Sequence, residues 1–436
     1  MYQADLTRIK ECMKRAKQGG ELTIGFLGGS ITQGSLANTE QDAYAYRVFH
    51  WWEETFQTAR FSYVNGGIGG TTSHYGVSRA VTDVLMYQPD FVVVDFSVND
   101  EADAFFQETF EGVVRKILSW PSHPALVLLN NVYYDTGANA QAYHNAIGEW
   151  YHVPYVSIKD TVYKQMVNGE YTRDELTSDG LHPNDKGHAL VAGEIIVFLE
   201  AIQASLDTET TAANERGRAI AKTAMSAVGA ERTKIEKAER TKIEKAEGAK
   251  IEKAEGAKIE KAEGAKIEKA KTEDTKGQAE PFADAAWEDV LPVPMTKNAY
   301  ENAKRLTIRE ISPRLDGFRA DAREKMGHLD HFKNGWIGTK PGDGIIFEVE
   351  ASCIAVQYRK AIRRPALRAE LILDGDMAHK VILDGNFEQD WGDCLFLEPI
   401  LHHGELARHT VEIRICEEEQ IDREVTPFYL MALIIA

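Results

Sequence analysis

The sequence predicts an α/β protein in which a parallel sheet, covered by helices on both faces, is followed by an all-β sandwich. Three observations lead to this prediction. Short apolar runs alternate with helix-length segments over the first half of the chain. A charged repeat then interrupts this pattern. After the repeat, short alternating runs are broken by glycine and aspartate, which is typical of antiparallel strands.

The first part, residues 1–205, contains five predicted strands that are separated by predicted helices. The strands are nearly continuously apolar, as expected where both faces of a parallel sheet are buried. They are expected at 22–27, 61–65, 91–96, 125–130 and 153–157. The helices are expected at 5–18, 42–59, 74–88, 103–119, 138–151 and 185–204. We therefore expect one three-layer domain here.

The second part, residues 206–280, has the composition of a spacer. Isoleucine recurs every eight residues from Ile235 to Ile267 in a sequence rich in glutamate, lysine and alanine. Eight residues advance about 800° around an α-helix, so the isoleucine stripe drifts by about 80° per repeat. That drift is too large for a coiled coil. We expect a solvated, partly helical or disordered spacer, and an interaction helix remains the alternative.

The third part, residues 281–436, is predicted to be a jelly-roll-like β-sandwich. Alternating runs occur at 345–350, 354–358, 369–375 and 409–415. Turn-forming residues, Pro-Gly-Asp-Gly at 341–344 and Asp-Gly-Asp at 374–376, flank such runs. The period of two and the turns distinguish this part from the first domain.

Four short segments of the first domain carry residues suited to acyl transfer. Ser30 follows the first strand in Gly-Gly-Ser-Ile-Thr, and Gly70 ends a glycine-rich turn after the second. Asn99 follows the third strand, and Asp179 precedes His182 in Asp-Gly-Leu-His-Pro. A serine nucleophile needs a histidine base, an aspartate to orient that base, and amide donors for the oxyanion. These segments contain all of these groups.

The order of these segments resembles the SGNH (GDSL-type) hydrolase superfamily over about residues 20–200. The resemblance implies a flavodoxin-like fold and a catalytic triad of Ser30, Asp179 and His182. It also implies an oxyanion hole made by the amides of Ser30 and Gly70 and the side chain of Asn99. In one departure, a glycine stands where the family usually has an aspartate before the nucleophile. This form is similar to the carbohydrate-esterase branch.

The resemblance implies a serine esterase that removes acetyl or other short acyl groups from oligosaccharides through an acyl-enzyme. The C-terminal sandwich resembles the carbohydrate-binding modules that accompany some of these esterases. Trp336 and Trp391 lie in turn-rich sequence, where each either stacks on a sugar ring or fills the core. Two alternatives remain open. One is a lipid or thioester hydrolase of the same superfamily, and the other is a glycan-binding protein with a vestigial hydrolase domain.

Composition limits the partners that we expect. The 436 residues carry a formal net charge of −18, and no basic stripe occurs outside the repeat region. Nucleic acid and anionic membranes are therefore not expected as partners. An acetylated oligosaccharide is the expected substrate, and a homo-oligomer remains open.

No metal or cofactor is expected, because no cysteine–histidine spacing typical of zinc sites and no phosphate-loop or dinucleotide fingerprint occurs. The four cysteines show no disulfide framework, and the first residues lack a signal-peptide pattern. No apolar run is expected to reach the ~18–20 residues of a membrane span. Together these features predict a cytoplasmic protein with reduced thiols.

Overall fold

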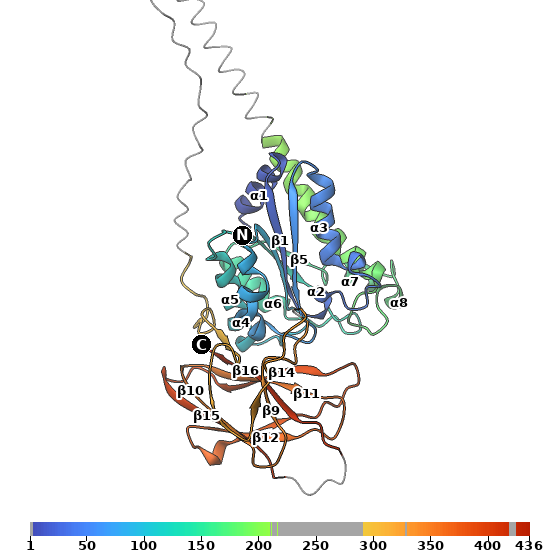
Figure 1. The fold of residues 1–436 in the computed structure, drawn as a ribbon. Coiled ribbons are helices and arrows are strands. Elements are labelled where there is room, and N and C mark those ends of the chain that lie inside the picture. The colour runs from blue at the N-terminus through green and yellow to red at the C-terminus, as the bar shows by residue number, and fades with distance from the viewer. Residues whose placement is uncertain (1–2, 210, 212–215, 217–290, 328, 418–423) are drawn as a thin grey trace, which may run out of the picture. The chain divides into compact units, whose positions relative to one another are not determined.

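The computed structural model describes residues 3–209, 211, 216, 291–327, 329–417 and 424–436 (Figure 1). The described residues before position 204 and after position 290 belong to one compact unit. The octapeptide repeat that begins at Ile235 lies outside the described residues. The spacer therefore remains a prediction from the sequence.

The N-terminal domain is built on a five-stranded sheet with the order β2-β1-β3-β4-β5. Every neighbouring pair is parallel. The strands are β1 Glu21–Gly28, β2 Arg60–Gly67, β3 Phe91–Asp95, β4 Ala125–Asn130 and β5 Tyr155–Ser157. Parallel pairing brings the carboxyl ends of all five strands to one edge of the sheet. The predicted parallel sheet is confirmed.

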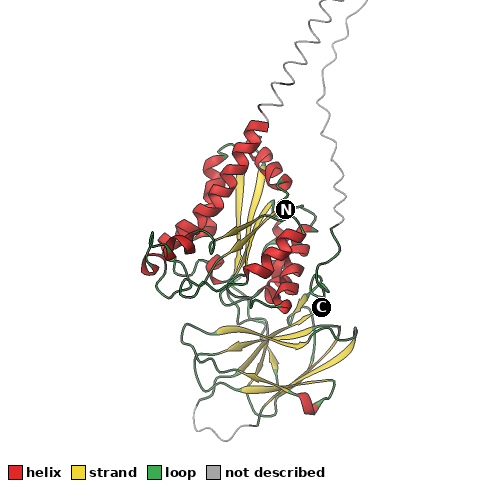
Figure 2. Cartoon of the chain, turned by 180° about the vertical axis from the view of Figure 1, so that it is seen from behind, coloured by secondary structure: helices red, strands yellow, loops and turns green. Residues whose placement is uncertain are grey.

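Helices cover both faces of this sheet (Figure 2). One face packs against α4, α5 and α6 through a buried cluster that includes Val92 and Val94 of β3. On the other face, the Trp52 ring of α3 lies 5.4 Å from the Phe91 ring of β3. The longer helices are α1 Thr7–Lys17, α3 Tyr44–Thr55, α4 Ser73–Asp83, α5 Ala104–Leu118 and α6 Gln141–Trp150. The expected three layers are present.

Three short helices were not predicted from the sequence. They are α2 Ser30–Gln33, α7 Val162–Val167 and α8 Arg173–Leu176. Helices of four to six residues span less than two turns, so they show no amphipathic period that a sequence pattern could reveal. Single-turn 3₁₀ segments occur at η1 Glu40–Asp42 and η2 Leu85–Tyr87, and the second ends the predicted helix 74–88 early.

The last helix of the domain, Asp185–Glu209, is long and apolar enough to cross a membrane by length and composition alone. The expectation that no segment has this character is therefore wrong. One third of its most apolar window is buried, and its fully buried residues include Val191, Ile195 and Leu199. The helix therefore packs against the domain along one face.

The C-terminal part is an all-β domain of two antiparallel sheets, which confirms the predicted sandwich. One sheet has the order β13-β12-β15-β10-β7, and the other β14-β11-β16-β9-β8 with β6 paired to β16. The strands are β6 Lys304–Leu306, β7 Arg314–Asp316, β8 Arg319–Ala320, β9 Trp336–Gly338, β10 Gly344–Ala351, β11 Ile354–Lys360, β12 Arg368–Leu373, β13 Val381–Asp384, β14 Cys394–Leu401, β15 Ala407–Ile415 and β16 Phe428–Ile435. A 3₁₀ turn, η3 Met377–His379, lies between β12 and β13.

Helix α5 joins the two domains. Its buried Phe110 and Val113 belong to one apolar cluster with Tyr300, Ala355 and Met431 of the C-terminal part. Polar contacts come from the same helix. The Arg115 guanidinium lies 2.7 Å from the Glu301 carboxylate, and the buried Glu111 carboxylate accepts a hydrogen bond from the Thr296 N–H at 2.8 Å. The two domains therefore share a continuous core.

The structure removes Trp336 from the candidate sugar contacts. This residue is 1% exposed and lies within the sandwich core, where its ring meets that of Phe347 edge-on at 5.2 Å. A ligand cannot reach its faces. Trp391, by contrast, is 57% exposed. The alternation of β9 turns Trp336 inward, which the surrounding turn residues did not indicate.

We expect Trp336→Ala to lower the free energy of unfolding by about 3–5 kcal/mol, because it opens a cavity in a packed core. Trp391→Ala, the matched exposed tryptophan, should cost less than about 1 kcal/mol. Urea unfolding followed by circular dichroism measures both. An equal loss for the two variants would contradict the core assignment of Trp336.

Candidate active site

Ser30, His182 and Asp179 form one chain of hydrogen bonds. Ser30 is the first residue of α2, directly after the carboxyl end of β1, and is largely buried. Its Oγ lies 2.8 Å from His182 Nε2, and His182 Nδ1 lies 2.7 Å from Asp179 Oδ2. The structure thus brings together three predicted residues that lie up to 152 positions apart in the sequence.

The Asp179 carboxylate is held in its ionised form. Partial burial by itself raises its pKa, but hydrogen bonds from the His182 ring and from the backbone N–H groups of Leu181 and His182 outweigh burial. The pKa of Asp179 falls to about 2. An aspartate that is charged at neutral pH keeps the proton of the neutral ring on Nδ1, so that Nε2 faces Ser30 as an acceptor.

Asn99 reaches the nucleophile turn because Gly29 has no side chain. A Cβ built on Gly29 would lie 2.1 Å from Asn99 Oδ1. The Gly29 N–H in turn donates to the backbone carbonyl of Asp95, at the end of β3, over 3.3 Å. The departure from the usual aspartate at this position therefore has a steric reason, since any larger residue would displace the Asn99 amide.

The loop that carries Gly70 is fixed beside Ser30. A Cβ built on the preceding Gly69 would lie 3.7 Å from Ser30 Cβ, and the Gly69 N–H donates to Gln33 Oε1 at 2.6 Å. Gly70 itself has a φ of +66°, a conformation that glycine adopts without strain. The residue that precedes the predicted glycine therefore lies beside the nucleophile.

Two buried charged residues hold these loops: Arg79, which the sequence analysis missed, and Asp100, for which the sequence suggested structural contacts. Arg79 donates to the Gly28 carbonyl at 2.8 Å and also to the Gly66 carbonyl, so it joins the carboxyl ends of β1 and β2. Asp100 accepts from the Ser73 N–H at 2.8 Å, at the start of α4. Arg79 carries no sequence signal for its contacts, because its partners are backbone groups of distant strands.

Asp95 also stabilises the structure around the nucleophile turn. It is buried at the end of β3, where its Oδ2 accepts from the Asn131 amide at 2.7 Å. Burial raises the pKa of Asp95 to about 6, although hydrogen bonds from Asn131 and Ser97 act against this rise. Like Asp100, it positions backbone around the site and does not contact the triad.

Trp391 of the C-terminal domain lies beside the Gly70 loop. Its Cη2 atom lies 3.5 Å from a Cβ built on Gly70. Phe387 supports the ring edge-on at 5.0 Å, and the indole N–H donates to the side chain of Gln389. An exposed aromatic ring is therefore held beside the predicted oxyanion glycine.

Two other histidines near these segments have structural roles. His188 accepts from the Tyr44 N–H at 3.3 Å and bonds the Ser35 carbonyl at 3.1 Å, and burial lowers its pKa to about 4. His74 is buried between the rings of Phe105 and Tyr300, and burial lowers its pKa to about 3. Both rings are neutral at neutral pH, and neither contacts Ser30.

The comparisons with known proteins agree with this geometry. The model of the GDSL-like lipase/acylhydrolase family matches residues 26–190, which include all five predicted site residues of the first domain. No curated protein matches the sequence.

Two solved structures match almost the whole chain. One is a two-domain esterase active on acetylated mannans, at 39% identity and a TM-score of 0.77, covering 99% of this chain and 96% of that chain. The other is the two-domain esterase active on acetylated mannans co-crystallised with mannopentaose, with the same identity, TM-score and coverage of this chain, and 95% coverage of its own. The chain is thus similar to these esterases over both of its domains.

Proposed function

Because the chain belongs to the GDSL-like lipase/acylhydrolase family, we propose that it is a serine esterase that removes acetyl groups from mannan-type oligosaccharides. The observation that carries this proposal is the chain of hydrogen bonds from Ser30 through His182 to Asp179. The mannan substrate is proposed from the similarity to the two-domain mannan esterases.

Ser30 attacks the ester carbonyl, and its proton passes to His182 over the 2.8 Å hydrogen bond. Asp179, with its low pKa, stabilises the imidazolium that forms. Collapse of the tetrahedral intermediate returns the proton to the departing sugar hydroxyl and leaves an acetyl-enzyme. His182 then takes a proton from water as the water oxygen attacks the acetyl carbonyl, and it passes this proton to Ser30 Oγ when acetate leaves.

Three groups surround the position where the oxyanion develops. As the first residue of α2, Ser30 has a backbone N–H that the helix itself does not use. The Gly70 loop lies against Ser30, and the Asn99 side chain lies against the turn before it. We assign the amides of Ser30 and Gly70 and the Asn99 side chain to the oxyanion hole.

Trp391 is the proposed contact for a sugar ring. It is exposed, it is supported by Phe387, and it lies beside Gly70. Aromatic faces bind the C–H faces of sugars with little loss of conformational freedom. The cytoplasmic location, the absence of nucleic-acid and membrane partners, and a homo-oligomer stay predictions.

The reaction is tested by mass spectrometry of acetylated manno-oligosaccharides before and after incubation with the protein. Ser30→Ala should lower kcat by on the order of 10⁶, since the nucleophile is lost while little volume changes. The matched control is Ser78→Ala on α4, whose hydroxyl donates to the Tyr75 carbonyl. Activity of Ser30→Ala within tenfold of wild type would require another nucleophile. Faster turnover of long-chain esters would favour the lipid-hydrolase alternative.

Gly29→Ala should act through Asn99, because the new methyl group occupies the place of the amide oxygen. We expect both Gly29→Ala and Asn99→Ala to lower kcat on p-nitrophenyl acetate by about 10²–10³, with KM little changed. The double variant should be no worse than either single one, since both remove the same donor. Gly193→Ala, where a Cβ meets open space, is the control. Additive losses would contradict the coupling.

Trp391→Ala should separate small from large substrates. We expect kcat/KM for p-nitrophenyl acetate to stay within about twofold, while that for acetylated manno-oligosaccharides falls about tenfold or more, because remote binding positions only the longer substrate. Trp391→Phe, which keeps a ring, should recover part of the loss. Equal effects on both substrates would contradict the sugar contact. Deleting the whole C-terminal domain is a poorer test, since it would expose the apolar cluster on α5.

A further inference from the structure

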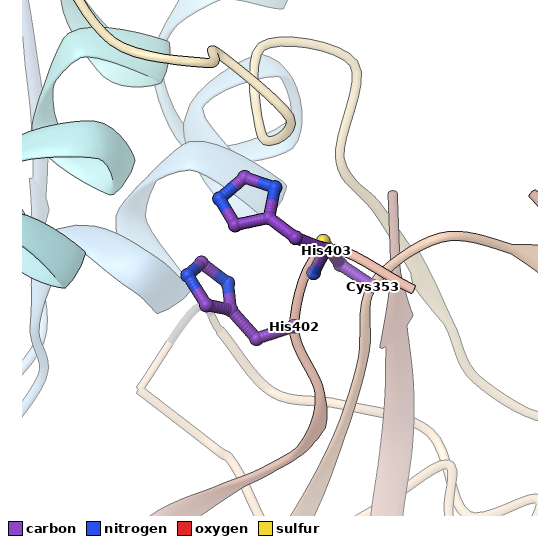
Figure 3. Close-up of side chains that lie close together, drawn as sticks. All are labelled: Cys353, His402 and His403. Carbon is purple, nitrogen blue, oxygen red and sulfur yellow. The ribbon is translucent and has the colours of Figure 1, made fainter. Parts of the chain in front are cut away.

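Three side chains with metal-binding atoms lie together outside the candidate active site. Cys353 occupies the turn between β10 and β11, and His402 and His403 directly follow β14. One potential ligand atom from each of the three lies within 4.8 Å of the others (Figure 3). The hydrolytic mechanism uses none of them.

Glu108 of helix α5 brings a fourth donor to this cluster. Its Oε2 lies 2.8 Å from His403 Nε2 and 4.0 Å from His402 Nε2. Its other oxygen, Oε1, accepts from the Ala299 N–H at 2.8 Å. The oxygen that already has a backbone partner thus points away, and the remaining oxygen faces the two imidazoles.

Neighbouring groups orient the ligands. Tyr300 hydrogen-bonds His402 Nδ1 at 2.8 Å, which leaves Nε2 of that ring for a metal. The His403 backbone N–H donates to Cys353 Sγ at 3.4 Å, a contact that helps to hold the sulfur in place. His403 has a φ of +55°, and the rings of the two consecutive histidines lie 4.0 Å apart.

The burial of these groups and the presence of a carboxylate suit a bound cation. Cys353 is 1% exposed and Glu108 is 4% exposed. Within the described ranges, the ion pairs of Glu108 are with these two histidines. A buried carboxylate is costly unless it is paired or bound to a metal. A divalent cation would give this carboxylate a further partner and would displace the proton of the Cys353 thiol on binding.

We propose that Cys353, His402, His403 and Glu108 form a structural zinc site that joins helix α5 to the β-domain. Zinc takes one sulfur, two imidazole nitrogens and one carboxylate oxygen in a closed tetrahedron. Bonds of about 2.0–2.3 Å place tetrahedral ligands about 3.3–3.8 Å apart, so Cys353, His402 and His403, whose ligand atoms lie within 4.8 Å of one another, need side-chain shifts of about 1 Å.

Zinc at this site would also anchor β14. Trp391 shortly precedes the start of this strand at Cys394, and His402 follows its end at Leu401. Fixing one end of β14 to α5 would help to hold the other end beside Gly70. This consequence rests on the proposed function, whereas metal binding does not.

The test is the zinc content of the full-length protein after chelation, reloading with zinc chloride and desalting. We expect about one zinc per chain by mass spectrometry of the metal, and a higher midpoint of thermal unfolding than for the chelated protein. Loading with cobalt instead should give an absorption band from thiolate-to-cobalt charge transfer. Less than about 0.2 zinc per chain without that band would overturn the proposal, whatever the esterase activity.

Variants identify the ligands. Cys353→Ser and His403→Ala should lose the zinc, and Glu108→Gln should weaken zinc binding by about 10–100-fold. Cys12→Ser is the matched control, because this buried thiol donates to the Asp90 carbonyl at 3.1 Å and a hydroxyl can replace it. Hydrolysis of p-nitrophenyl acetate confirms that each variant is folded. Equal zinc in wild type, Cys353→Ser and His403→Ala would also overturn the site.

Discussion

The parallel pairing of β1, β2 and β3 is the constraint on which the rest of this site depends. Because these three strands run in the same direction, the segments that follow them meet at one edge of the sheet. These segments carry Ser30, the Gly70 loop and Asn99. Arg79 and Asp100 then fix the loops at that edge through backbone groups. The catalytic base His182 lies on a separate loop before the last helix. There Asp179 orients the imidazole of His182 toward Ser30. The nucleophile therefore meets its partners without any of them being close in sequence.

Helix α5 is the second organising element. Its apolar face belongs to the cluster that covers the sheet, and that cluster continues into the C-terminal domain. Its charged residues Glu108, Glu111 and Arg115 hold the segment that leads into that domain and the loop after β14. The β-domain is thus packed on the hydrolase domain, and Trp391 lies beside Gly70.

Much of this arrangement follows from local sequence. The longer helices and all five strands of the first domain begin and end within about five residues of their expected positions. The reason is that the spacing of apolar residues along the sequence follows from which face of each helix or strand is buried. The triad residues and Asn99 could be predicted from the sequence because each lies at the end of a strand or in a short motif. The four- to six-residue helices and the backbone contacts of Arg79 carry no such signal.

The sequence by itself determined the two fold classes and the residues of the candidate triad, since each depends on a pattern within a few neighbouring positions. Only the tertiary structure decided which tryptophan is exposed beside the site and which is buried, because the sequence around both is rich in turn residues. It also brought Cys353 together with His402, His403 and Glu108, which no zinc-type spacing in the sequence predicted. Metal ligands that come from separate strands and from another domain become neighbours only through packing.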